Sequence, residues 1–184
     1  GSDIPIACAG IISKVNQVFM AICIGISQGS QPILGFNYGA EKYSRVRQTY
    51  RYSVTLCTVI ATIFFICFQF FPHQIVGIFG NGSDLYFHFA EKYLRLFMLM
   101  TFANGIQPMS ACFFTSIGKA RLGVIMSLTR QVLFLLPLIV IFPVFFGIDG
   151  VMYAGPIADT SAFVLAVVFA RRELGVMKAA EQNA

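Results

Sequence analysis

Three ionisable side chains lie deep inside long apolar stretches of the sequence: Lys14, Arg130 and Asp159. Each lies about 12 to 15 Å from the nearer end of its stretch, at about 1.5 Å of rise per helical residue. If these stretches cross a membrane, a charge at that depth costs about 2.5 to 3.5 kcal/mol on insertion scales. Such side chains normally face a protein interior or a water-filled cavity, so the three are the first candidates for function.

Asp159 has the chemistry of an ion-coupling residue. Burial disfavours a charged carboxylate, whereas a neighbouring Lys14 or Arg130 would favour it. A carboxyl group held between these effects can bind or release a proton as its surroundings change. The alternative is a permanent buried ion pair that fixes the register of two helices. For Lys14 and Arg130, structural pairing with a carboxylate or snorkelling is favoured over a direct role in coupling.

Uncharged polar side chains share the same stretches, and they could line a polar cavity or bond neighbouring helices to one another. These candidates are Asn16, Gln28, Gln31, Asn104 and Gln107. The sequence shows no spacing typical of a catalytic triad, paired catalytic carboxylates, a metal cluster or a phosphate-binding loop. We therefore expect neither an enzyme nor a bound cofactor or metal.

The elements that position these residues follow from composition. The sequence is 57% hydrophobic and 11% charged, which is outside the usual range of soluble domains. About 20 apolar residues cross the roughly 30 Å hydrocarbon core of a bilayer, and helices satisfy their own backbone hydrogen bonds in lipid. We predict an all-α polytopic bundle, embedded in membrane lipid, with five transmembrane helices: Ile4 to Phe36, Ser53 to Phe71, Phe87 to Ser116, Leu122 to Phe146 and Val151 to Ala170.

Basic residues predict the orientation of this bundle. Of thirteen Lys and Arg residues, nine lie in the segments 42–51, 119–121 and 171–178, whereas the connections 72–83 and 147–150 contain none. Because basic connections of membrane proteins remain in the cytoplasm, we place these segments and the C-terminus there, in an inner (plasma) membrane. The same clustering argues against a nucleic-acid partner. Five crossings put the N-terminus outside, so we expect a fragment cut in a loop.

Two irregular features are expected along the chain. Pro108 removes a backbone donor and should kink the third span near Asn104. The apolar segment 75–80 is too short to cross a membrane and should form an interfacial helical turn before a turn at 81–84. The transmembrane part is predicted to span 1–172, with a more polar cytoplasmic tail at 173–184.

Several motifs occur in one order along the chain and cover it up to about Arg172. In this pattern the chain resembles the bacterial branch of the multidrug and toxic compound extrusion (MATE) transporters. The motifs are GSQPILGFNYGA at 29–40 followed by RVR at 45–47, Gln107 with GKA at 118–120, Arg130-Gln131 followed by Pro137, and GIDGV at 147–151 followed by PIAD at 156–159.

The resemblance implies an architecture and an activity. MATE transporters have twelve helices in two six-helix lobes, and this chain matches helices eight to twelve, without helix seven or the N-terminal lobe. The family exports cationic and amphipathic drugs in exchange for protons or sodium ions by alternating access. Its best-known coupling carboxylate lies on the first helix, outside this chain. Some sodium-coupled members carry an acidic residue in the third of the present spans, where this chain has Asn104 and Gln107. Asp159 lies in a Pro-x-x-Asp pattern similar to one on the family's last helix.

Two alternatives to a drug exporter follow from the same observations. The first is a lipid-linked oligosaccharide flippase of the same superfamily, which would show a longer cationic cavity. The second is a membrane scaffold or partner subunit with no transport of its own, although the mid-membrane Lys14, Arg130 and Asp159 argue against it.

Overall fold

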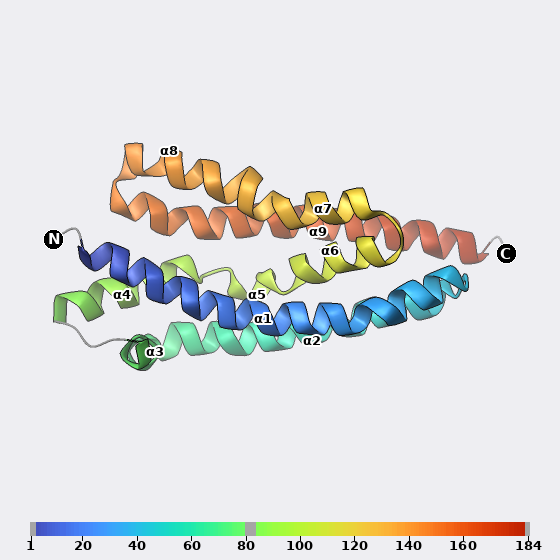
Figure 1. The fold of residues 1–184 in the computed structure, drawn as a ribbon, viewed down its shortest axis with the longest axis horizontal. Coiled ribbons are helices and arrows are strands. Elements are labelled where there is room, and N and C mark those ends of the chain that lie inside the picture. Colours follow the sequence, from blue (N-terminus) through green and yellow to red (C-terminus); the bar gives the residue numbers. More distant parts are fainter. Residues whose placement is uncertain (1–2, 80–83, 183–184) are drawn as a thin grey trace.

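The computed structural model describes residues 3–79 and 84–182, and every regular element in this part of the chain is a helix. Helices α1 (Asp3–Gly39), α2 (Tyr43–Phe70) and α9 (Ile148–Gln182) run along the bundle (Figure 1). The others are α3 (Pro72–Phe79), α4 (Asp84–Phe97), α5 (Thr101–Asn104), α6 (Ile106–Ser116), α7 (Ala120–Leu128), the π-helix η1 (Thr129–Leu135) and α8 (Leu136–Phe146). In Figure 1 α4 lies beside the first part of α1, near α3, and α6 lies between the α1–α2 pair and the layer of α7 and α9.

The predicted all-α fold and its spans are confirmed. Within the described residues, four helical segments are long and apolar enough to cross a membrane, and a bent pair makes a fifth span if its two halves are counted together. The segments are Cys8–Gly39, Tyr43–Phe70, Ala120–Phe146 and Tyr153–Gln182, with Tyr86–Phe97 and Thr101–Ser116 as the bent pair. The short segment before the third span forms α3, and the turn expected after it lies largely outside the described residues.

The bend in the third span lies one turn earlier than predicted. The two halves meet at 46° across the break at 98–100, and a second interruption follows at Gly105. Pro108 lies in the first turn of α6, and Asn104, whose carbonyl would have accepted its missing donor, is the last residue of α5, so this second interruption lies where the proline predicts one. Gly105 is required by packing: a Cβ there would lie 2.9 Å from the Cys57 carbonyl oxygen of α2.

The three basic segments gather at one end of the bundle. Figure 1 places the α1–α2 connection, the α6–α7 connection and the C-terminus together at this end, which we call the basic end. Helix α9 does not stop near Arg172 but continues to Gln182. Its last turns form ion pairs with residues at or near the α6–α7 and α1–α2 connections. Lys119 Nζ lies 2.6 Å from Glu173 Oε1, and Arg47 Nη2 lies 2.6 Å from Glu181 Oε2. The charge alternation read from the sequence is therefore an alternation between two ends of the fold.

Helix α9 packs through small residues at a spacing of four, which bring its backbone close to its neighbours. The buried residues of this face are Ala154, Ala158, Ala162, Ala166 and Ala170. By contrast, α8 buries none of its side chains, and large apolar residues such as Val140 and Val144 are exposed on it. An apolar surface of this extent is compatible with lipid rather than water.

Candidate functional site

A buried network of three side chains joins three helices in the middle of the bundle. Arg130 Nε donates a hydrogen bond of 2.5 Å to Asp159 Oδ1, and Asn104 Nδ2 donates one of 2.7 Å to Asp159 Oδ2. The side chains of Arg130 and Asp159 are only 8% and 2% exposed. Each carboxylate oxygen of Asp159 therefore accepts a hydrogen bond from a nitrogen donor, and the buried charge is paired and hydrogen-bonded, as buried charges in proteins normally are.

Local backbone geometry brings the partners together. Arg130 lies in the π-helix η1, and the Thr129 hydroxyl donates to the Ile125 carbonyl oxygen at 2.5 Å near the start of this segment. A π-turn has one more residue than an α-turn and often marks a functional position. On α9, Asp159 lies beside the buried Ala158, within the small-residue face. On α5, Asn104 is the last residue before the Gly105 break.

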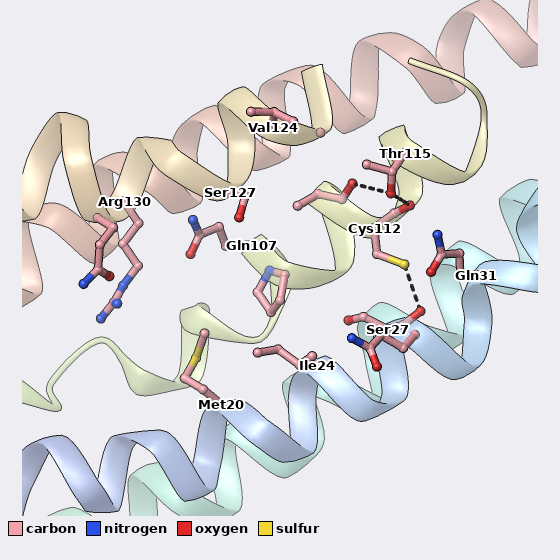
Figure 2. Close-up of a pocket in the computed structure, with 15 residues that line it drawn as sticks. Met20, Ile24, Ser27, Gln31, Gln107, Cys112, Thr115, Val124, Ser127 and Arg130 are labelled. Carbon is pink, nitrogen blue, oxygen red and sulfur yellow. Dashed lines mark hydrogen bonds between the residues drawn. The ribbon is translucent and has the colours of Figure 1, made fainter. Parts of the chain in front are cut away.

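A groove of about 480 Å³, lined by both apolar and polar side chains, runs along α1, α6 and the α7–η1 segment next to this network. Figure 2 shows side chains from these helices pointing into the space between them. The lining residues are Met20, Ile24, Ser27, Gln28, Gln31, Gln107, Pro108, Ala111, Cys112, Thr115, Gly123, Val124, Ser127, Arg130 and Gln131. Arg130 belongs to both the buried network and the groove.

The groove has an unusual charge pattern for a site that would receive cations. Arg130 is the one charged residue among the described residues that line it, and none of them is acidic. Four glutamine amides and the hydroxyls of Ser27, Thr115 and Ser127 supply the other polar groups. The volume lies within the roughly 300 to 1,000 Å³ typical of pockets for drug-sized molecules.

Hydrogen bonds across the helices hold the walls of the groove. Gln107 Nε2 donates to the Met126 carbonyl oxygen at 2.9 Å, which links α6 to α7. Cys112 Sγ donates to the Ser27 carbonyl oxygen at 2.9 Å, which links α6 to α1 and is drawn in Figure 2. With side chains bonded across both gaps, the groove is a preformed feature of the lobe.

The structure brings together some of the residues that the sequence singled out. Gln28, Gln31 and Gln107 line the groove. Asn104 instead bonds Asp159, and Asn16 is not among the lining residues; its Oδ1 is buried without a hydrogen-bond partner in the described chain.

Of the two predicted charge partners of Asp159, the structure supplies one. Arg130 forms the ion pair, whereas Lys14 is exposed on α1 and takes part in none of the ion pairs found within the described residues. Arg130 and Asp159 face each other because η1 packs directly on α9. Lys14 is therefore not brought to Asp159.

Sequence reasoning missed several residues that line the groove. Met20, Ile24 and Ser27 are among them, and they share one face of α1 with the predicted Gln28 and Gln31, at steps of three and four residues. This spacing is the signal that could have added Met20 and Ser27 to the candidates. Ser127 and Gln131 repeat the step of four on the facing segment. Cys112 had no such signal, because its role depends on a contact with another helix.

Across the parts of the chain that the structure describes, no group of three or more His, Cys, Asp or Glu residues lies close enough to hold a metal ion.

Comparison with known proteins identifies the family. The family model described as MatE matches residues 2–148. The chain belongs to the MatE family. A MatE relative, the multidrug export protein MepA of Staphylococcus saprophyticus, is 26% identical over 177 residues, which is 95% of this chain and 39% of the relative. Another relative, an FAD transporter of Shewanella oneidensis, is 21% identical over 95% of this chain and 38% of its own length.

Solved structures share the fold. A multidrug resistance MATE family transporter of the MOP superfamily, in an outward-facing conformation, matches with a TM-score of 0.88 at 16% identity. The match covers 97% of this chain and 40% of that one. The chain therefore spans about two fifths of the length of the relatives it matches and has the fold of part of a multi-pass MatE transporter.

Proposed function

We propose that this chain forms helices eight to twelve of the C-terminal lobe of a cation-coupled exporter of cationic or amphipathic drugs that works by alternating access. The observation that carries the proposal is the Arg130–Asp159 pair, which is buried at mid-bundle and borders a groove lined by both polar and apolar side chains. An intramembrane ion pair next to a polar cavity is typical of ion and substrate pathways. The groove would be this lobe's share of the central cavity, with the N-terminal lobe and helix seven supplying the rest.

Within this mechanism, Asp159 is the proposed coupling residue. Its two oxygens accept hydrogen bonds from Asn104 and Arg130, and the proposed mechanism couples proton exchange at Asp159 to movement of Arg130 away from it. The fixed positive charge of Arg130 disfavours a sodium ion at the same carboxylate. We therefore propose the proton as the coupling ion of this lobe, and replacing the proton gradient by a sodium gradient in proteoliposomes should abolish uphill export.

The test is Asp159→Asn in the full-length exporter. Asparagine keeps the shape of the side chain and removes the exchangeable proton. We expect proton-driven drug export to fall at least tenfold and to lose its dependence on external pH. Asp84→Asn, which removes an exposed carboxylate at the start of α4, is the control and should leave export unchanged. Unchanged export by Asp159→Asn across the pH range would contradict a coupling role.

The orientation is proposed from charge and topology together. The basic end, with the C-terminus of α9, would face the cytoplasm of a plasma-membrane protein. Single cysteines introduced at Arg121 and at Asp84, on opposite ends, should react with a membrane-impermeant thiol reagent only from inside and only from outside the cell, respectively. The reverse pattern would overturn the orientation.

Transport requires more than this chain under the proposal. The cavity of an alternating-access exporter has two sides, and the chain supplies helices for one of them. Reconstituted alone, it should export no drug. The scaffold alternative predicts instead that the full-length protein keeps its function after Lys14, Arg130 and Asp159 are all neutralised.

A further inference from the structure

Arg130 uses only part of its hydrogen-bonding capacity in the buried network. Its Nε donates to Asp159, whereas Nη1 and Nη2 have no hydrogen-bond partner among the described residues. The side chain is 92% buried, and its remaining surface lies in the groove that it lines. Neither Nη atom is among the fully buried unpartnered atoms, so both stay accessible. Figure 2 shows the guanidinium extending from η1 into the space between the helices.

This geometry suits an oxyanion. A guanidinium presents planar pairs of N–H groups that match the two oxygens of a carboxylate or phosphate, and one edge can be used while another is occupied. In this structure Asp159 accepts hydrogen bonds from Arg130 Nε and Asn104 Nδ2 and not from Arg130 Nη1 or Nη2, which leaves that edge of the guanidinium free. Gln131 and Ser127 line the groove within one turn of Arg130 and can add hydrogen bonds.

We propose that the free Nη1–Nη2 edge of Arg130 binds a carboxylate or phosphate oxyanion of the transported molecule. The C-terminal lobe then accepts zwitterionic and anionic amphipathic compounds, and not only cations. The absence of any carboxylate from the described lining of the groove favours the same class, since an acidic residue would repel an oxyanion. The assignment rests on the proposed function as an exporter and specifies the substrate class of its groove.

A pair of dyes isolates the oxyanion. Rhodamine 123 is the methyl ester of rhodamine 110, so the two share the ring system and differ in whether a free carboxylate is present. Equilibrium binding of each dye to the purified full-length exporter, followed by fluorescence anisotropy, gives a ratio of affinities for rhodamine 110 over rhodamine 123. Uphill export of each dye by the wild-type exporter in proteoliposomes gives a second readout, which is independent of the variants used for binding.

All variants carry the Asp159→Asn change, so they differ from one another only in the side chain at position 130. Asp159→Asn with Arg130 intact is compared with Asp159→Asn/Arg130→Gln, which lacks both charges. Removing the guanidinium should lower the affinity ratio about tenfold or more, as expected for the loss of one charged hydrogen bond, while binding of rhodamine 123 stays within about twofold. Arg130→Lys in the Asp159→Asn background should give an intermediate ratio, because lysine keeps the charge without the planar fork.

The control and the opposing outcomes separate this assignment from the export function. Arg121→Gln removes an exposed cation from the same span and should leave the ratio unchanged. Competition by phosphatidylglycerol against rhodamine 110 alone would place a lipid phosphate on the same edge and support the oxyanion site. If Arg130→Gln leaves the affinity ratio unchanged in the Asp159→Asn background while the wild-type protein exports rhodamine 123, the assignment is overturned and the proposed export function stands. Failure to bind or export either dye contradicts both.

Discussion

Two carboxylates of α9 form ion pairs of almost the same length in contrasting surroundings. Asp159 lies 2.5 Å from Arg130 at mid-bundle, and its side chain is 2% exposed. Glu181 lies 2.6 Å from Arg47 at the basic end, and its side chain is 41% exposed. Distance alone would rank the two pairs as equal. Burial separates them, because the interaction between charges and the penalty for losing a partner both grow as water is excluded.

The largest expected effect comes from breaking the buried pair on one side only. Arg130→Gln leaves Asp159 as a buried carboxylate without its cation, and the loss of stability should be about 3 to 5 kcal/mol. The double variant Arg130→Gln/Asp159→Asn removes both charges and should recover most of that loss. Thermal unfolding of the full-length protein in detergent measures the difference. If the single variant is as stable as the double variant, then burial does not make the Arg130–Asp159 pair more sensitive to the loss of one partner than the exposed Arg47–Glu181 pair.

The second test disturbs the third member of the network without touching a charge. Gly105→Ala places a Cβ 2.9 Å from the Cys57 carbonyl oxygen and pushes the α5–α6 junction away from α2. Overpacking of this kind costs about 1 to 3 kcal/mol, and it should also displace the neighbouring Asn104 from Asp159. Gly25→Ala is the matched control, because no atom lies within 4 Å of a Cβ at that position. Equal unfolding temperatures for the two variants would contradict the close approach.

An intermediate case sharpens the comparison. Glu173 of α9 is 10% exposed and receives two hydrogen bonds of 2.6 Å from Lys119, whose own side chain is 41% exposed. Glu173→Gln keeps the shape and removes the charge. Partial burial places its expected effect at about 1 kcal/mol, between the other two pairs. Chemical unfolding at low and high salt should show the loss in both conditions, and a loss that disappears in high salt would place this pair with the exposed one.

The smallest effect is expected at the exposed pair. Glu181→Gln should change stability by less than about 1 kcal/mol, because solvent and salt screen the charge that it removes. The change should vanish at high salt. A loss comparable to that of Arg130→Gln would mean that the last turn of α9 is buried in the full-length protein.

Much of the fold could be predicted from the sequence, because the physics of a bilayer restricts the choices. The lengths of the apolar runs predicted the transmembrane helices, and the clustering of basic residues predicted which connections lie at the same end of the bundle. Gln28, Gln31 and Gln107 lie along the groove, and Gln107 also bonds a neighbouring helix, so their role as the lining of a transport cavity stays a prediction. The role of Asp159 in coupling and the cytoplasmic position of the basic end stay predictions.

The sequence could not predict which side chains pair within the site. Pairing depends on how each helix is rotated about its axis and on breaks in the backbone, and not only on a residue's depth in the membrane. Lys14 and Arg130 lie at similar depths in the sequence, yet only Arg130 reaches Asp159. Asn104 bonds the carboxylate because the chain breaks at 98–100 and again at Gly105. The π-helix has no signature in composition, since the residues from Thr129 to Leu135 fit an α-helix equally well.

The π-helix that carries Arg130 also bears on how such chains change over generations. A π-turn holds one residue more than the α-helix around it, so the segment 129–135 corresponds to the insertion of a single residue in an otherwise regular span. Deleting one residue there would restore a regular helix and rotate everything on one side by about 100° relative to the other. Relatives lacking that residue should align with a single gap in this segment, and they would need a different partner for the aspartate on the last helix.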